Sequence, residues 1–306
     1  MELYNEELSN LTQFDESTVN VLLSEGLEEL TESNWNGINY RKSSEGIFGS
    51  IKTHIVPAND GAAIERNALS LYRSIFGFIS EYPEYELVRI WHFVPLIVNE
   101  MDRSAPDVEG YRCFNSGRFK AFRERYGNEI SQWRIPAATA VGAQDEYLSI
   151  EFFASSAPCH FFENKVQIPA YRYSKKYGKL PPVFVRGALC HLKDATLLIT
   201  SGTASVVMED SIHEDDLCGQ IRQTFDNLKV LSDKANLKNY GLNFAFGFDD
   251  LTVLRVYYKN SEEKECIEKE IGKYVSPECN VHYVNTDICR KELVIEIEGI
   301  YKKIIC

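Results

Sequence analysis

Near its C-terminal end the chain reads ELVIEIEGIY over residues 292–301. The stretch alternates as a β-strand does, with successive side chains pointing to opposite faces. One face is apolar and consists of Leu293, Ile295, Ile297, Gly299 and Tyr301. The other face carries Glu296 and Glu298 between Val294 and Ile300. The pattern therefore predicts a strand on which two acidic side chains share one face.

Two interpretations of this acidic pair stay open on the residues alone. A solvated edge strand can carry acidic side chains into water, and burying such groups is costly. If instead one carboxyl is buried, desolvation and the neighbouring charge both raise its pKa, and it can then donate a proton near neutral pH.

The elements that precede this strand decide the fold class. We expect two strands with a break between them at 195–208, and then a helix from Ser211, where Glu214 has capping-box spacing. A strand at 251–258, a helix from Ser261 and a strand at 281–284 follow. This order predicts an α+β fold with helices on one face of a sheet. The other face is then free for a ligand.

The first half of the chain mixes helices and strands. Apolar spacing predicts helices at 62–82 and 117–126, and extended segments at 87–98 and 147–153. No internal repeat, low-complexity stretch or Gly/Ser linker is visible, so any boundary between domains must be compact. We predict an N-terminal domain at 1–150 and a C-terminal domain at 151–306.

Composition excludes several classes of protein. The 306 residues are 44% hydrophobic and carry a net charge of −12, which excludes disorder and makes nucleic acid a poor partner. Apolar runs are far shorter than the roughly 18 residues of a membrane span, and no signal peptide is visible, so we expect a cytoplasmic protein. Because the eight cysteines form no CxxC pair and the six histidines no HExxH or HxH pair, no metal site is predicted.

Two further segments carry candidate binding residues. The run QIPAYRY (167–173), followed by Tyr177 and Arg186, indicates an ordered loop, because its arginine can bind carboxylates and its tyrosines can fix a ring. Aromatic packing on a surface loop is the alternative. The run FNSGR (114–118) can cap a helix with Arg118 on its first turn, or serve as a cap alone.

Together these segments resemble the chorismatase family, and the second half is similar to the RidA (YjgF-like) fold. The matching stretches are FNSGRFKAF (114–122), IPAATAVGA (135–143), ENKVQIPAYRYSKKYG (163–178), TSGTAS (200–205), QIRQTFDNLKVL (220–231), LRVYY (254–258) and DICRKELVIEIEG (287–299). The resemblance implies two RidA/YjgF-like (chorismate mutase-like) halves with mixed sheets, the C-terminal one carrying most of the active site. It covers most of the chain from about Trp91 onward.

The family's reaction implies the roles of the acidic pair. Chorismatases release the enolpyruvyl group of chorismate as pyruvate without cofactor or metal, using a glutamate that matches Glu296 as the acid. Glu298 is then the second candidate, or a partner that keeps Glu296 protonated. Members of the family differ in their ring product. Gly202 and Cys289 resemble the members that form 3-hydroxybenzoate, in some cases with 4-hydroxybenzoate. Hydrolytic members give a dihydroxycyclohexadiene carboxylate instead. A glycine leaves room for the ring, and a thiol can relay a proton.

The resemblance also implies how the substrate is held. Arg172, Arg118 and Arg186 are the candidates for its two carboxylates, with Tyr171 and Tyr177 shaping the pocket. Arg290 ranks lower, because in an extended segment it points away from its neighbour Cys289. The chain departs from the family at 165–166, where Lys-Val replaces the usual Pro-Arg.

Two alternative functions are an imine deaminase like the RidA proteins and a binding module for aromatic acids that has lost catalysis. We expect a monomer or a homotrimer.

Overall fold

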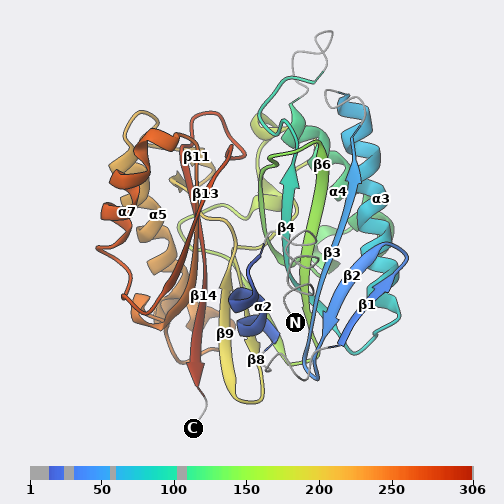
Figure 1. Cartoon of the computed structure of the whole chain (residues 1–306), viewed down its shortest axis with the longest axis horizontal. Helices are drawn as coiled ribbons and strands as arrows, with labels where there is room; N and C mark the ends of the chain where they lie inside the picture. The colour runs from blue at the N-terminus through green and yellow to red at the C-terminus, as the bar shows by residue number, and fades with distance from the viewer. Residues whose placement is uncertain (1–13, 24–30, 56–59, 102–108, 305–306) are drawn as a thin grey trace, which may run out of the picture.

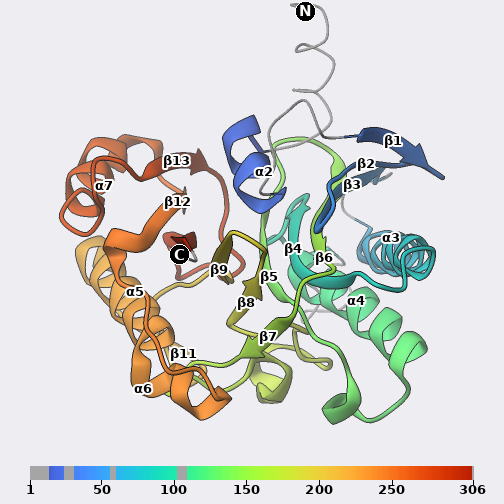
Figure 2. The same ribbon diagram turned by 90° about the horizontal axis from the view of Figure 1, so that it is seen from below.

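Two β-sheets face each other in the computed structural model, which describes residues 14–23, 31–55, 60–101 and 109–304 (Figure 1). Each sheet has six strands. Helices α3 (Gly61–Ser80) and α4 (Gly110–Tyr126) cover the outer face of the first sheet, and α5 (Leu217–Ser232) and α7 (Lys264–Ile271) cover that of the second (Figure 2). The inner faces therefore meet in the middle of the molecule.

The strands divide between the sheets in chain order. The first sheet contains β1 (Thr31–Trp35), β2 (Ile38–Lys42), β3 (Gly46–His54), β4 (Glu86–Val94), β5 (Ala137–Gly142) and β6 (Tyr147–Ser155). The second contains β7 (Cys159–Phe162), β8 (Gly187–His191), β9 (Ala195–Thr200), β12 (Leu251–Tyr258), β13 (Asn280–Asn285) and β14 (Ile295–Ile304). Smaller elements are α2 (Glu16–Leu23), the hairpin β10 (Val206–Val207) and β11 (Asp210–Ser211), and α6 (Lys234–Leu237).

The two sheets have the same topology. Their orders are β1-β2-β3-β6-β4-β5 and β7-β8-β9-β14-β12-β13, so each half places its sixth strand between its third and fourth. In each half the last two strands of that order, β4 with β5 and β12 with β13, are parallel, and the other pairs are antiparallel. The predicted α+β class, with two related halves, mixed sheets and helices on one face, is confirmed.

The change from one sheet to the other comes later than predicted. The boundary placed at residue 150 cuts strand β6, which continues to Ser155 and pairs with β3 along its whole length. The second sheet begins with β7 at Cys159. The division between the halves therefore lies between Ser155 and Cys159.

Two predicted helix starts are wrong. Helix α4 begins at Gly110, so Arg118 lies in the middle of the helix and the FNSGR run is no cap. Helix α5 begins at Leu217, where the Asp216 side chain accepts from Gly219 N at 2.9 Å. Ser211 lies in β11 instead, and its hydroxyl donates to Glu292. Tertiary contacts at α4 and the Asp216 side chain at α5 thus place the helix start elsewhere than the sequence pattern predicts.

A similar shift occurs at α7. Its first turn is the 3-10 segment Ser261–Glu263, and Asn260 rather than Ser261 caps it by accepting from Glu262 N at 3.1 Å. The strand predicted before it, β12, has the predicted bounds.

Candidate active site

Strand β14 lies in the centre of its sheet, between β12 and β9. Its apolar face packs under α5 and α7, where Ile295, Ile297 and Tyr301 are buried. The opposite face turns toward the other sheet, and there Glu296 is 4% exposed and Glu298 is 5% exposed. The interpretation of these glutamates as the acidic face of a solvated edge strand is therefore wrong.

Glu298 is held by four hydrogen-bond donors. Arg89 Nη2 lies 2.6 Å from its Oε2, Trp91 Nε1 lies 2.8 Å from its Oε1, and Tyr257 donates to Oε1 at 3.2 Å. The Thr139 hydroxyl also donates to Oε2. Because an ionised carboxylate is a pure acceptor, four donors and one ion pair fit a charged Glu298. Glu298 does not line the cavity described below, so its predicted place among substrate-contacting residues is corrected.

Glu296 has a different environment. Burial, followed by the negative charge of Glu298, raises its pKa to about 8 against the opposing effects of Arg89, Arg186 and Cys289. The Cys289 sulfur lies 3.9 Å from Oε2 of Glu296. Glu296 is therefore a carboxylic acid that keeps its proton at neutral pH.

The thiol of Cys289 is also protonated. Burial raises the pKa of Cys289 well above its ordinary value. A thiol and a carboxyl group in contact can pass a proton between them without either forming a free anion in water.

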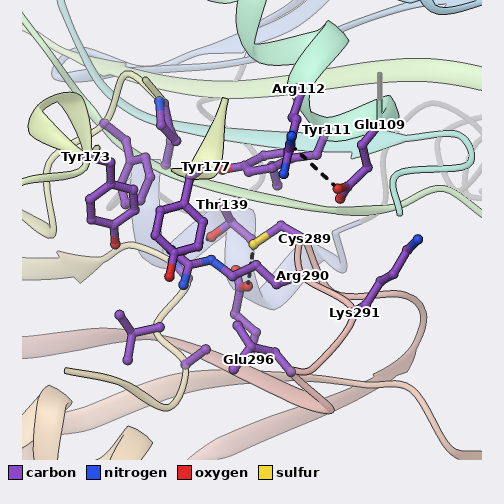
Figure 3. Close-up of a pocket in the computed structure, with 18 of the residues that line it drawn as sticks. Glu109, Tyr111, Arg112, Thr139, Tyr173, Tyr177, Cys289, Arg290, Lys291 and Glu296 are labelled. Carbon is purple, nitrogen blue, oxygen red and sulfur yellow. Dashed lines mark hydrogen bonds and ion pairs between the residues drawn. The ribbon is translucent and has the colours of Figure 1, made fainter. Parts of the chain in front are cut away.

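A cavity of about 350 Å³ opens onto Glu296 between the two halves (Figure 3). This volume suits a small organic molecule. Six residues proposed from the sequence line it, namely Glu296, Cys289, Gly202, Arg118, Arg186 and Tyr177. Further lining residues include Glu109, Tyr111, Arg112, Thr139, Tyr173 and Arg290.

Two of the arginines in this wall are buried without an acidic partner. Arg118 is 1% exposed and Arg186 is 4% exposed. Arg118 donates to Asn115 Oδ1 at 2.6 Å, and Arg186 donates to the Tyr173 hydroxyl at 2.5 Å. Among the described residues neither forms an ion pair, and the Nε of each has no hydrogen-bond partner. Two unpaired buried cations make the cavity suitable for an anion.

Arg290 also lines the cavity, contrary to its low rank. The chain bends at Cys289 and Arg290 instead of running extended, so both side chains reach the cavity. The Arg290 guanidinium lies 3.8 Å from the centre of the Tyr177 ring, and it donates to Glu209 O and to Ser211 Oγ.

The structure places Arg172 and Tyr171 outside the cavity lining. They belong to the 3-10 turn Ala170–Arg172, in which each residue is rotated by about a third of a turn from the last. Tyr173 is the residue of this run that reaches the cavity, and Arg172 is exposed. Of this run, Tyr173 and not Tyr171 or Arg172 is therefore placed where a ligand of the cavity can touch it.

Gly202 approaches Glu296 too closely for any side chain. A methyl group on its Cα would overlap Oε1 of Glu296 and lie 2.9 Å from Thr139 Oγ1. The Gly202 amide donates to Thr139 Oγ1 at 2.8 Å, which holds this turn against the first sheet. The glycine therefore sets the position of the Glu296 carboxyl.

Two kinds of feature are absent from the residues that the structure describes. Within ranges 14–23, 31–55, 60–101 and 109–304, no group of three or more His, Cys, Asp or Glu side chains is placed to hold a metal ion. In the same ranges no helix combines the length and apolar character that crossing a bilayer requires.

A buried acid, a thiol and buried arginines around one cavity are typical of an enzyme active site. Comparison with known proteins identifies the family of enzymes. Residues 24–154 match the family described as chorismatase FkbO/Hyg5-like, N-terminal. The chain is 31% identical over 270 residues to a 3-hydroxybenzoate synthase of Streptomyces hygroscopicus, covering 87% of this chain and 76% of that protein. The chain belongs to the chorismatase family.

Other relatives agree with this assignment. A chorismatase of Streptomyces rapamycinicus is 29% identical over 292 residues, which cover 94% of this chain and 84% of that protein. A crystal structure of a chorismatase matches with a TM-score of 0.79 at 27% identity, covering 88% of this chain and 78% of that one. The family predicted from the sequence is confirmed.

Proposed function

We propose that this enzyme cleaves chorismate to pyruvate and 3-hydroxybenzoate. The observation that carries the proposal is the buried Glu296 carboxyl, whose pKa burial helps raise to about 8, at the wall of a cavity that also holds two buried arginines outside ion-pair distance of the described carboxylates. Chorismate has two carboxylates and an enol ether. The cavity offers cations for the carboxylates and an acid for the enol ether.

The reaction begins with proton transfer from Glu296. Its proton goes to the methylene carbon of the enolpyruvyl group, the bond between the ether oxygen and the ring carbon breaks, and pyruvate leaves with that oxygen as its ketone, so Glu296 becomes a carboxylate. The oxygen of the neighbouring ring hydroxyl then bridges to the vacated ring carbon and stays on it when its bond to its original carbon breaks. The ring then loses one proton as it becomes aromatic. Cys289, 3.9 Å from Glu296, relays that proton back to the carboxylate. The atoms of chorismate equal those of pyruvate plus hydroxybenzoate, so this route consumes no water.

Arg118 and Arg186 bind the substrate carboxylates in this proposal. Each lies buried in the cavity wall with unused donors, so an anion gains strong charge-assisted hydrogen bonds there. Tyr173, Tyr177 and Arg290 form the adjoining wall. Because Gly202 has no Cβ, the Glu296 carboxyl can lie directly against its Cα.

The test is incubation of the purified protein with chorismate, followed by chromatography of the products. We expect pyruvate and 3-hydroxybenzoate in equal amounts. A dihydroxycyclohexadiene carboxylate as the sole ring product contradicts the aromatising outcome, because hydrolysis consumes one water. Absence of pyruvate contradicts the proposed function as a whole.

A further inference from the structure

Two cysteines lie directly opposite each other on neighbouring strands of the second sheet. Cys159 begins the edge strand β7, and its partner in the antiparallel register is Cys190 of β8. Their sulfur atoms are 2.9 Å apart, which is closer than two unbonded sulfurs ordinarily lie, and both residues are free thiols. Neither lines the cavity, so the proposed reaction does not use them.

The position of the pair in the ladder suits a covalent bond. His191 N donates to the Pro158 carbonyl oxygen at 3.0 Å, so the hydrogen-bonded pair of residues lies next to Cys159 and Cys190. Hydrogen-bonded and non-hydrogen-bonded pairs alternate in an antiparallel ladder, and the Cα atoms of the second kind lie about 4.5 Å apart. That spacing falls within the range of about 4.4 to 6.8 Å that a disulfide spans. Forming the bond therefore requires little movement of either strand.

The two thiols differ in their access to reagents. Cys159 is partly exposed at the edge of the sheet, whereas Cys190 is 0% exposed and belongs to the core. Burial also raises the pKa of the Cys190 thiol well above its ordinary value, which keeps it protonated. An oxidant in solution therefore reacts first with Cys159, and Cys190 completes the bond.

We propose that Cys159 and Cys190 are a modification site at which a small disulfide such as oxidised glutathione forms a reversible cross-link. The thiolate of Cys159 attacks one sulfur of oxidised glutathione, and one glutathione leaves as its thiolate. The Cys190 sulfur gives up its proton and attacks the Cys159 sulfur of the mixed disulfide, and the second glutathione leaves. The protein loses two protons and two electrons, and oxidised glutathione takes them up to become two thiols.

The bond closes a loop that contains one wall of the cavity. The two cysteines are 31 residues apart in the chain, and the segment between them carries Tyr173, Tyr177 and Arg186, which line the cavity. A cross-link of this length restricts the unfolded chain and so stabilises the folded one. It also ties the edge strand β7 to its neighbour β8. Oxidation thus fastens both ends of the segment that forms this wall.

The first test maps the bond in the wild-type protein. The protein is incubated with about 1 mM oxidised glutathione near pH 8, where thiol exchange is efficient. Free thiols are then blocked in denaturant, and the digested protein is analysed by mass spectrometry without reduction. We expect a peptide pair joining Cys159 to Cys190 in most molecules, which dithiothreitol separates. Recovery of Cys190 as a blocked thiol, or linked to a different cysteine, overturns the proposal.

The second test measures what the bond does to stability. Oxidation should raise the Tm of the wild type by about 5 to 10 °C, and an unchanged Tm overturns the stabilising role. Cys159→Ser cannot form the bond, so its Tm should be the same with and without oxidised glutathione.

The matched control is Cys266→Ser, which removes an exposed cysteine of α7 and should keep the whole gain in Tm. A gain that persists in Cys159→Ser, or that disappears in Cys266→Ser, overturns the proposal. Neither test uses chorismate, so a failure of the proposed function leaves both outcomes readable.

Discussion

The two halves of the molecule share one topology and differ in what they bring to the cavity. Strands β6 and β14 hold equivalent places in their sheets, and each carries buried glutamates. Counted from the register shift that both strand pairs contain, Glu151 corresponds to Glu298, and Glu296 lies two residues before Glu298. Glu151 lies opposite Trp91 of β4, and Glu296 lies opposite Tyr257 of β12. Both are nearly fully buried, but only Glu296 lines the cavity.

The two glutamates differ in what surrounds their carboxyl groups. Glu296 has a neighbouring carboxylate, a thiol and an open cavity, and these come from different elements. The N-terminal half supplies Arg118 and three of the four donors that hold Glu298. The C-terminal half supplies the acid, the thiol and the glycine turn. Neither half contains a complete site, so the chemistry depends on how the sheets pack.

The largest expected change in rate comes from replacing each of the two glutamates with glutamine, one at a time. Glu296→Gln keeps the shape of the side chain and removes its acidic proton, so kcat for pyruvate release should fall by roughly two to four orders of magnitude. Glu151→Gln is the matched control on the equivalent strand, and its kcat should stay within about 3-fold of wild type. Steady-state assays with chorismate measure both. Equal losses in the two variants would remove the distinction between the strands.

The second effect concerns one arginine from each half. Arg118→Gln and Arg186→Gln should each raise KM for chorismate about 10- to 100-fold, because each removes a charged hydrogen-bond donor from the substrate. Arg172→Gln, exposed and outside the cavity lining, is the control and should change KM less than 2-fold. A large effect at Arg172 would show that substrate binds elsewhere.

A third, smaller effect is expected at the turn. In Gly202→Ala the added methyl group displaces the carboxyl of Glu296, so kcat should fall by about 10-fold. The fraction of non-aromatic diol should rise. Chromatography of the products and a crystal structure of the variant measure the two consequences. A wild-type rate and product pattern would mean that the carboxyl position is not set by this glycine.

The smallest expected change in rate belongs to Cys289→Ala. Pyruvate release should stay within about 3-fold of wild type, because Glu296 still supplies the first proton. The ratio of hydroxybenzoate to diol should fall, since the ring proton loses its relay. Quantifying both ring products separates these effects, and an unchanged ratio assigns Cys289 to packing alone.

Much of the fold was predictable because local pattern and tertiary structure agree in it. The strand 251–258 has the predicted bounds, and the alternation in β14 separates the acidic face from the apolar one. Helix α4 was missed over its first turns because Gly110, Asn115 and Ser116 are poor helix formers. Close packing of Gly117 on the backbone of α3 stabilises the helix there. That contact has no signature in the local sequence.

The site could be predicted only in part. Glu296, Cys289 and Gly202 were identified through the family resemblance, and the structure brings all three together at the cavity. The donors to Glu298 could not be predicted, because Arg89 lies 209 residues away in the chain. The repeated topology was equally hidden, since the two halves share strand order without a visible sequence repeat.

The protonation state of Glu296 is the most direct measure of the account. Its pKa of about 8 places the acid form below that pH and the carboxylate above it. Infrared difference spectra of wild type against Glu296→Gln should show a protonated carboxyl at pH 7 that disappears as pH rises through 8, with kcat falling over the same range. A carboxylate at pH 6 would contradict the proposal that Glu296 is the proton donor.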